Sequence, residues 1–473
     1  MDTSAFRDIL LKQFAHQPTS GQAVLVNKIS EFCTKPGSAG VFVLKGYAGT
    51  GKTTIISALI KSLPAVNAKS VLLAPTGRAA KVLSNYSQKQ AFTIHKKIYK
   101  RMVTADGIGR FVVQPNLHTS TLFIVDEASM ISDGGGFSDT SSLLDDLMRY
   151  VTSASKCKII FIGDTAQLPP VGLDVSPALD VDYLKSSYAV TIDSVELKDV
   201  VRQQAGSGIL VNATDIRNLI ASDSQETPHF TLDNFKDIVR LEGADLEDAL
   251  NNAYSNSGVE GTAVICRSNK RANQFNQQIR ARIRWQESEL SAGDYMMVVK
   301  NNYNWLSDDS KAGFIANGDI IELLKVGSVK EQYGFRFADA QIRLIDYPDE
   351  RPFEVKLLLD ALAAEAPALS NEQNKSLYHA VLADYMDIPD KRKRLIELKK
   401  DPFFNALQVK FAYAITCHKA QGGQWETVFV DQGYLTDEMI NTEFLRWLYT
   451  AVTRATKKLY LVNFNKEFFG AAE

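Results

Sequence analysis

Val41-Phe42-Val43-Leu44-Lys45-Gly46-Tyr47-Ala48-Gly49-Thr50-Gly51-Lys52-Thr53-Thr54 is a strand-like run that passes into a glycine-rich turn. The β-branched and aromatic residues before Gly46 are typical of a strand, and the apolar pattern after Thr54 is typical of a helix. Glycines at this spacing let the backbone turn tightly, so that successive N–H groups face a phosphate at a helix N-terminus. The pattern G-x-x-x-x-G-K-T therefore predicts that the chain binds a nucleoside triphosphate.

This phosphate loop also predicts roles for individual side chains. We expect Lys52 to contact the β- and γ-phosphates and the Thr53 hydroxyl to ligate Mg²⁺. The alternative is a glycine-rich turn with a chance lysine, which the strand before it and the helix after it disfavour. The residues expected to bind the nucleotide are Gly46, Ala48, Gly49, Thr50, Gly51, Lys52, Thr53 and Thr54.

Length and composition set the frame for the rest of the chain. A chain of 473 residues exceeds what one hydrophobic core usually holds, so several domains are expected. The hydrophobic content of 45% and the charged content of 23% are ordinary for a soluble globular protein. The net charge of −2 shows no global basic field, although a local basic groove is enough to bind nucleic acid.

The cysteines and the N-terminal residues bear on the cell compartment. Cys33, Cys157, Cys266 and Cys417 lie far apart and form no C-x-x-C pair, so neither a zinc site nor a disulfide framework is expected. The first residues lack a signal-peptide pattern, and no apolar run approaches the roughly 20 residues that span a bilayer. We therefore expect a cytoplasmic protein without a membrane segment.

Strand, turn and helix recur after the phosphate loop. This alternation predicts a parallel sheet covered on both faces, with ligands at the carboxyl ends of its strands. The apolar run 121–125 ends in Asp126 and Glu127. Asp126 can hold Mg²⁺ through its waters, and Glu127 can polarise the attacking water. The alternative for this acidic pair, that it caps the next helix, is weaker downstream of a complete phosphate loop.

Two insertions interrupt the α/β pattern. The β-prone runs of residues 98–104 and 110–114 flank Asp106-Gly107, which predicts a hairpin. Short alternating strands between residues 293 and 360 predict a small β-barrel, followed by polar helices over residues 368–400. The charge run that opens the last helix, Lys391 to Arg394, is interpreted as a solvated helix face. A second α/β region is expected from about residue 186, split by the barrel.

Seven stretches together resemble one family, the superfamily 1 helicases. The matching stretches are Gly46–Thr53, Ala74–Leu83, Thr93–His95, Asp126–Ser129, Gly163–Gly172, Ala414–Gly423 and Tyr449–Ala455. The motif Ala414–Gly422 resembles subgroup B in particular, the RecD-like and Dda-like enzymes. The resemblance implies two RecA-like parallel-sheet domains with Mg-ATP between them. It also implies single-stranded DNA across their top, 5′→3′ translocation, and forked duplex DNA as the substrate.

The resemblance also implies a domain layout. Residues 1–92 and 121–185 would form the first RecA-like domain, with residues 93–120 as an inserted pin. Residues 186–292 and 406–473 would form the second RecA-like domain. Residues 293–405 would form an inserted SH3-like β-barrel with a helical extension. A monomer is expected.

Further site residues follow from the resemblance, position by position. Gln22 resembles the glutamine that reads adenine, although its position taken alone favours simple capping of a helix. Gln167 resembles the residue that links the γ-phosphate to DNA. Arg202 and Arg454 resemble the arginines that the second domain directs at the γ-phosphate, and complete a catalytic set with Lys52, Glu127 and Gln167. The positions implied to contact DNA are Pro75, Thr76, Lys81, Thr93, His95, Thr416, His418, Lys419 and Gln421.

Rival functions remain open at this point. An RNA helicase or a translocase that strips proteins would share these motifs, and a nucleotide switch without motor activity would share the phosphate loop. The lack of a zinc-ligand cluster disfavours the RNA-directed relatives. The two arginine candidates and the second α/β half disfavour the switch.

Overall fold

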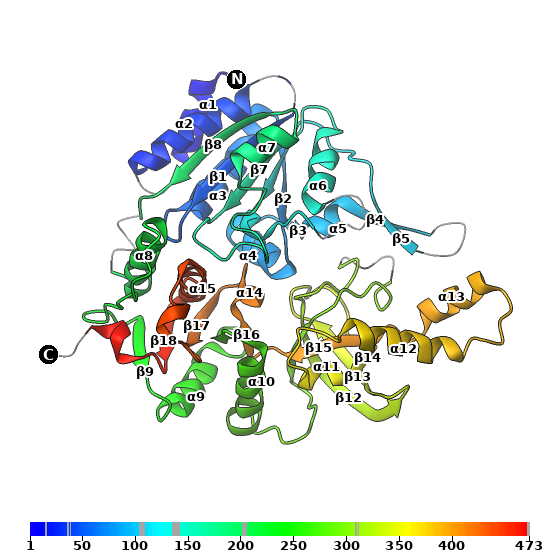
Figure 1. The fold of residues 1–473 in the computed structure, drawn as a ribbon. Coiled ribbons are helices and arrows are strands. Elements are labelled where there is room, and N and C mark those ends of the chain that lie inside the picture. The colour runs from blue at the N-terminus through cyan, green and yellow to red at the C-terminus, as the bar shows by residue number, and fades with distance from the viewer. Residues whose placement is uncertain are drawn as a thin grey trace.

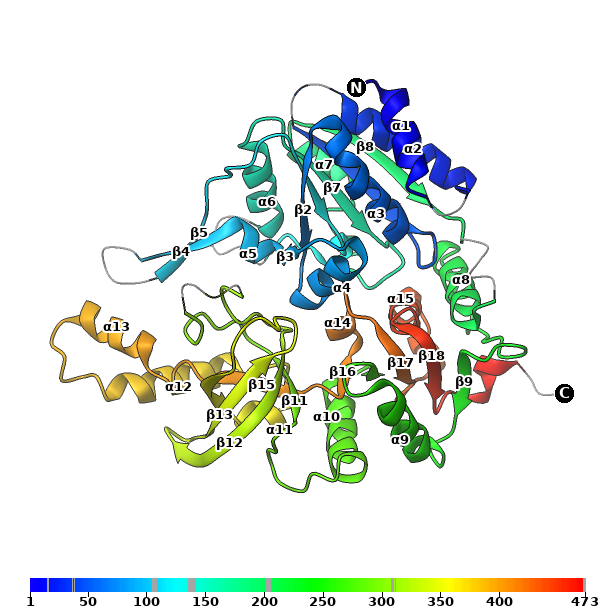
Figure 2. The ribbon, with the colours of Figure 1, turned by 180° about the vertical axis from the view of Figure 1, so that it is seen from behind.

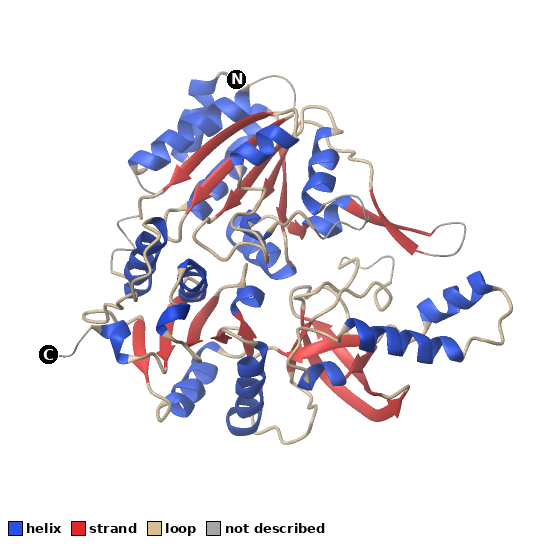
Figure 3. Cartoon of the chain, in the orientation of Figure 1, coloured by secondary structure: helices blue, strands red, loops and turns tan. Residues whose placement is uncertain are grey.

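The chain folds into two α/β halves with a β-barrel beside the second half (Figure 1). The computed structural model describes residues 1–14, 17–35, 37, 39–103, 109–134, 142–200, 206–307, 310 and 312–470. Figure 3 shows the helices packed around each of the two α/β sheets. No helix within these described ranges is long and apolar enough to cross a membrane.

The first sheet is parallel and has the strand order β3-β2-β6-β7-β1-β8. Its strands are β1 (Gly40–Gly46), β2 (Lys69–Ala74), β3 (Ala91–Thr93), β6 (Thr121–Val125), β7 (Lys158–Gly163) and β8 (Thr191–Leu197). Alternate residues of each buried strand face opposite sides of a sheet. Phe42 and Leu44 accordingly pack on one side, while Val41 and Val43 pack on the other.

Helices cover both faces of this sheet. The side of Phe42 carries α1 (Thr3–Lys12), α2 (Ser20–Thr34) and α3 (Lys52–Ser62), together with Leu83 of α4 (Gly77–Ser87). The side of Val41 carries α5 (Ile94–Ile98), α6 (Leu143–Thr152) and α7 (Val181–Ser187). The expectation of a parallel sheet buried between helices is confirmed.

The edge strand β8 corrects the expected start of the second half. It pairs with β1 from Gly40↔Thr191 to Gly46↔Leu197, so the first sheet continues past the boundary expected at residue 185. The segment alternates polar and apolar residues, and only Val195 and Leu197 enter the core beneath it. Because a strand at a sheet edge needs no continuous apolar run, its sequence did not resemble the buried strands.

The second sheet is also parallel, in the order β16-β10-β17-β18-β9. Its strands are β9 (Ile238–Leu241), β10 (Thr262–Cys266), β16 (Ala414–Thr416), β17 (Trp425–Asp431) and β18 (Ala455–Val462). One face packs against α8 (Gly208–Ala221) and α15 (Thr442–Val452), and the other against α9 (Leu246–Ser257) and α10 (Asn269–Gln278). Ala166 and Leu168 from the first half join the former core, so the two halves share apolar contacts.

The predicted barrel is present and closed. Its strands are β11 (Tyr295–Val298), β12 (Ile320–Gln332), β13 (Phe335–Leu344), β14 (Phe353–Leu358) and β15 (Leu407–Phe411). The expected short strands between residues 293 and 360 include one long strand, β13, which spans Phe335–Leu344. β15 closes the barrel against β11 and β14, which corrects the expectation that the second RecA-like domain resumes at residue 406. Pairing with strands distant in sequence decides this, and no local pattern encodes it.

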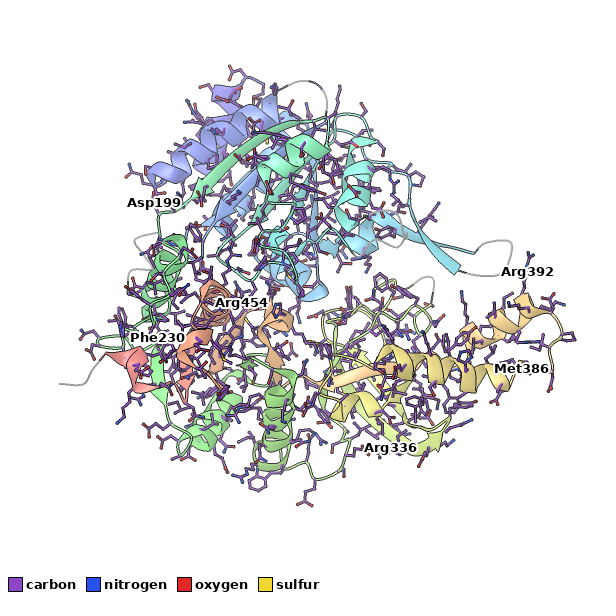
Figure 4. The ribbon with its side chains drawn as sticks, viewed as in Figure 1. Asp199, Phe230, Arg336, Met386, Arg392 and Arg454 are labelled. Carbon is purple, nitrogen blue, oxygen red and sulfur yellow. The ribbon has the colours of Figure 1, made fainter. Side chains whose placement is uncertain are left out.

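A hairpin and a helical arm extend from the same side of the molecule (Figure 2). β4 (Tyr99–Val103) and β5 (Gly109–Val113) pair antiparallel, which confirms the predicted hairpin. Its expected turn at Asp106-Gly107 lies outside the described residues. Beyond the barrel, α11 (Asp360–Ala363) leads to the arm, made of α12 (Asn371–Ala383) and α13 (Lys391–Lys400). Figure 4 labels Met386 and Arg392 near the tip of this arm.

Candidate nucleotide site and nucleic-acid track

The phosphate loop connects the end of β1 to the start of α3. Gly49 and Gly51 adopt left-handed backbone angles, with φ of 74° and 82°. A Cβ on Gly46 would lie 3.0 Å from Thr50 Oγ1 and 3.1 Å from the Lys52 side chain. Lys52 Nζ donates to the carbonyl oxygens of Gly46, at 2.5 Å, and Tyr47, at 2.8 Å. The loop therefore needs its glycines, and the lysine folds over it.

The two predicted carboxylates follow β6 and enter the same cleft as the phosphate loop. Asp126 accepts hydrogen bonds from Tyr86 Oη at 2.5 Å and from the Glu127 backbone N–H at 2.9 Å. Burial raises the pKa of Glu127, the positive charge of Arg454 opposes that rise, and the charge of Asp126 adds to it. A carboxylate poised in this way suits general-base chemistry.

The chemistry of the donor set at this position fits Mg²⁺. The Asp126 carboxylate and the Thr53 side chain line one cleft and offer hard oxygen ligands. Mg²⁺ is usually bound by one or two protein oxygens together with substrate phosphates and waters. These two residues would hold the ion, which would neutralise charge on the phosphates.

The cleft between the two halves has a volume of about 720 Å³, within the usual range of ligand pockets. Its second wall includes Arg454, which lies between the two sheets at the end of α15 (Figure 4). The guanidinium donates to Thr450 O at 3.0 Å, to Gly423 O at 3.2 Å and to Thr453 Oγ1 at 3.2 Å. The side chain is only 3% exposed, so its position is set by the second half before any ligand binds.

Three further residues were predicted to bind or sense the nucleotide: Gln22, Gln167 and Arg202. Gln22 accepts from Thr19 N–H at 3.1 Å and donates to Thr50 O at 3.0 Å, so its amide oxygen caps α2 and its amide nitrogen connects α2 to the phosphate loop. This arrangement combines the capping alternative with contact to the loop. Gln167 lines the cleft, and its buried Oε1 has no hydrogen-bond partner in the described part of the chain. Arg202 lies outside the described residues.

The predicted track begins at the ends of β2 and β3, which are neighbours in the sheet. Thr76 caps α4 and accepts from Ala79 N–H at 3.2 Å, while Thr93 caps α5 and accepts from Lys96 N–H at 3.2 Å. Pro75 precedes the first cap, and His95 follows the second. These positions form one edge, at the carboxyl ends of parallel strands, where α/β sheets bind ligands.

The second part of the track meets the first. Thr416 ends β16 and precedes α14 (Cys417–Ala420), which carries His418 and Lys419. Gly422 follows with φ of 71°, and a Cβ there would lie 3.3 Å from Thr76 Oγ1. The two predicted sets of DNA residues are thus contiguous across the junction of the two halves.

Two of the predicted track residues hold other elements. Gln421 is buried and donates to Leu168 O at 2.6 Å, so it connects the second half to the loop after β7. Lys81 pairs with Asp346 at 3.3 Å and with Glu260 at 3.7 Å. Its ammonium group therefore contacts the barrel and the second half.

The sequence interpretation missed two tyrosines of this site. Tyr86 donates to Asp126 from α4, and Tyr449 crosses the junction between the halves to contact Ala48 and Asp164. Tyr449 is the first residue of the motif Tyr449–Ala455, but no local pattern indicates that its hydroxyl contacts the other half of the chain. Only the juxtaposition of α15 and the phosphate loop reveals it.

Comparisons with known proteins find matches in both halves of the chain. Residues 19–224 match the family model described as AAA domain, and residues 411–462 match the one described as UvrD-like helicase C-terminal domain. The ATP-dependent DNA helicase dda of Enterobacteria phage T4 is 24% identical over 450 residues, covering 89% of this chain and 93% of that protein.

Two further similarities extend over most of the chain. The ATP-dependent RecD2 DNA helicase of Deinococcus radiodurans is 24% identical over 426 residues, covering 88% of this chain and 46% of that protein. A Pif1 helicase structure at forked double-stranded DNA superposes with a TM-score of 0.48 at 15% identity, covering 97% of this chain and 95% of that one. With a match to the AAA domain model over its first sheet and a match to the UvrD-like helicase C-terminal domain model over part of its second, the chain is similar to superfamily 1 helicases of subgroup B, the Dda-like and RecD-like enzymes.

Proposed function

We propose that this protein is an ATP-dependent DNA helicase that moves 5′→3′ along single-stranded DNA and separates the strands of a forked duplex. One observation carries the proposal. The phosphate loop with Glu127 and the arginine Arg454 come from different halves of the chain and line one cleft. Hydrolysis of ATP in such a cleft depends on how the two halves sit relative to each other, which is what a motor requires.

The roles proposed for the chain's residues follow from their positions. The loop N–H groups and Lys52 bind the β- and γ-phosphates of ATP, and Glu127 orients and deprotonates the attacking water. Arg454 stabilises the charge that develops on the transferred phosphoryl group, because a planar guanidinium matches its oxygens. Bound by Thr53 and Asp126, Mg²⁺ supplies charge neutralisation.

The coupling to DNA is proposed to run through the loop that follows β7. Gln421 donates to Leu168 O at 2.6 Å, and Thr450 Oγ1 accepts from Leu168 N–H at 2.8 Å. Gln421 belongs to the predicted track and Thr450 to the helix that carries Arg454. A change in the cleft can therefore move the track through one short loop. Hydroxyls and single positive charges along the track suit sugar-phosphate contacts without base reading.

The hairpin β4–β5 is proposed to act as the wedge that splits the duplex, and the barrel with its arm as an accessory domain. The two strands of the hairpin follow α5 in the first half, directly after the predicted track residues Thr93 and His95. A 5′ tail would deliver the fork to this side, as the resemblance of the motif Ala414–Gly422 to subgroup B implies.

Unwinding of forked substrates tests the proposal. Forks with only a 5′ tail, only a 3′ tail, or both are incubated with Mg-ATP, and strand separation is followed by fluorescence. Separation that needs the 5′ tail and ATP is expected. Use of the 3′ tail would refute the polarity, and an ATPase stimulated by RNA and not by DNA would favour the RNA-directed alternative.

A further inference from the structure

One tyrosine hydroxyl joins the two halves at the back of the nucleotide cleft. Tyr449, on α15 of the second half, donates to Asp164 Oδ2 at 2.7 Å and accepts from the Ala48 backbone N–H at 2.9 Å. Asp164 follows β7, and Ala48 belongs to the phosphate loop. The tyrosine side chain is 1% exposed and Asp164 is 2% exposed, so water does not compete for these bonds.

The chemistry of the hydroxyl makes this contact persistent. Burial raises the pKa of Tyr449 well above its ordinary value, and the nearby Asp164 charge raises it further, so the group stays protonated. A protonated phenol is both the donor that Asp164 needs and the acceptor that Ala48 needs. Bonds to a buried carboxylate are among the stronger ones, and removing one partner leaves the other unsatisfied.

Hydrogen bonds at the C-terminal end of α15 link Tyr449 to Arg454, which follows the helix. Thr453, one turn beyond Tyr449, donates its hydroxyl to Tyr449 O at 2.8 Å and accepts from Arg454 Nη2 at 3.2 Å. The Tyr449 residue therefore links two sets of hydrogen bonds: its hydroxyl bonds to the phosphate loop, and its backbone carbonyl connects through Thr453 to the guanidinium of Arg454, which lines the same cleft as Glu127. Residues four apart lie on one face of a helix, so this link needs no bend in α15.

A second connection on α15 reaches the predicted track. Cys417 Sγ, at the start of α14, lies 3.5 Å from Trp447 O of α15. α14 also carries His418 and Lys419. The helix that Tyr449 fixes against the phosphate loop thus contacts both the catalytic arginine and the short helix of the track.

From this geometry we propose that Tyr449 is a positioning residue that couples the phosphate loop to Arg454 and to the DNA track. Its hydroxyl sets the depth and rotation of α15 against the first half, so that Arg454 faces Glu127 only when the halves are closed. This inference rests on the proposed function, because it concerns how DNA binding stimulates ATP hydrolysis. It assigns Tyr449 no contact with ATP or DNA.

The variant Tyr449→Phe tests the inference, because it keeps the buried ring and removes only the hydroxyl. The kcat of DNA-stimulated ATPase should fall about tenfold or more, the scale expected for losing a hydrogen bond to a buried charge. Basal ATPase should fall less than DNA-stimulated ATPase, so that the ratio of stimulated to basal rates drops, while the KM for ATP and the affinity for a fluorescent single-stranded DNA should stay within about twofold of wild type, since Tyr449 is assigned no contact with either ligand. Tyr460→Phe is the matched control, because this hydroxyl is on β18 and outside the cleft lining.

Each other outcome overturns the inference. An equal fall in basal and stimulated turnover together with a lower Tm would assign Tyr449 a structural role only, and an unchanged ratio of stimulated to basal rates would assign it none. If the wild type itself is not stimulated by DNA, the proposed function fails along with the coupling. Should Tyr449→Phe fold poorly, Asp164→Asn weakens the same bond from the other half, and the same selective loss of stimulation is required.

Discussion

Asp319 offers a quantitative test of how the barrel meets the first half. Its side chain is 1% exposed, and its Oδ2 accepts from Ala316 N–H at 2.7 Å. Its Oδ1 has no hydrogen-bond partner in the described ranges and lies 2.8 Å from where a Cβ of Gly77 would be. Burial raises the pKa of Asp319 to about 7; the Ala316 N–H and Lys96 lower it, and the charge of Asp346 raises it. This carboxylate is therefore held beside the start of α4, where the predicted track begins.

The raised pKa gives the direction and size of a pH effect on stability. The folded state holds the proton up to about pH 7, whereas the unfolded chain releases it near its ordinary value of 3.8. Protonated Asp319 therefore contributes stability that is complete below pH 3.8 and lost as the pH rises to about 7. At 1.36 kcal/mol per pKa unit, the loss is about 4 kcal/mol. Asp319→Asn keeps the shape and cannot ionise, so it should escape this loss.

Paired unfolding experiments on wild type and Asp319→Asn from pH 4 to pH 8 measure the effect. The variant should gain relative to wild type as the pH rises, and the difference should level off above about pH 7. The net stabilisation of the variant above pH 7 is smaller than about 4 kcal/mol, because an amide N–H group that finds no partner costs about 1–3 kcal/mol. This cost is the same at every pH. Asp233→Asn, at an exposed position, serves as the control. A stability difference between wild type and Asp319→Asn that does not change with pH would refute the reasoning.

Further predictions concern the motor. Glu127→Gln should lower ATP turnover by at least about 10²-fold while nucleotide binding persists. The turnover of the wild type should fall as the pH drops through the raised pKa of Glu127, because the general base must be ionised. Near-normal turnover in that variant would remove Glu127 from the mechanism. Arg454→Ala should reduce DNA-stimulated ATPase by about 10³–10⁵-fold with unchanged DNA affinity; weakened DNA binding at full turnover would make it a track residue. Replacing residues 102–111 by a short Gly-Ser turn should preserve DNA-stimulated ATPase and reduce unwinding of a 5′-tailed fork, because each base-pair step stores about 1.4 kcal/mol of stacking. Unchanged unwinding would show that the hairpin only packs.

The sequence by itself determined the chemistry of the nucleotide site and the class of the fold. The spacing of Gly46, Gly51 and Lys52 is a local pattern, because one loop of backbone must surround one phosphate group. Asp126 and Glu127 could be recognised for the same reason, since a buried strand followed by acids is readable within a few residues. The hairpin and the barrel were predictable from alternation and turn residues, which are also local signals.

Only the tertiary structure decided which segments belong together across the chain. The edge strand β8 joins the first sheet and β15 closes the barrel through pairing with residues far away in sequence, and neither pairing leaves a distinctive local pattern. The hydroxyl of Tyr449 meets Ala48 across 401 positions, and Lys81 pairs with acids of the barrel and the second half. Such contacts depend on how two separately folded halves sit against each other. The burial and charge that set the pKa of Asp319 likewise exist only once the barrel has met the first half.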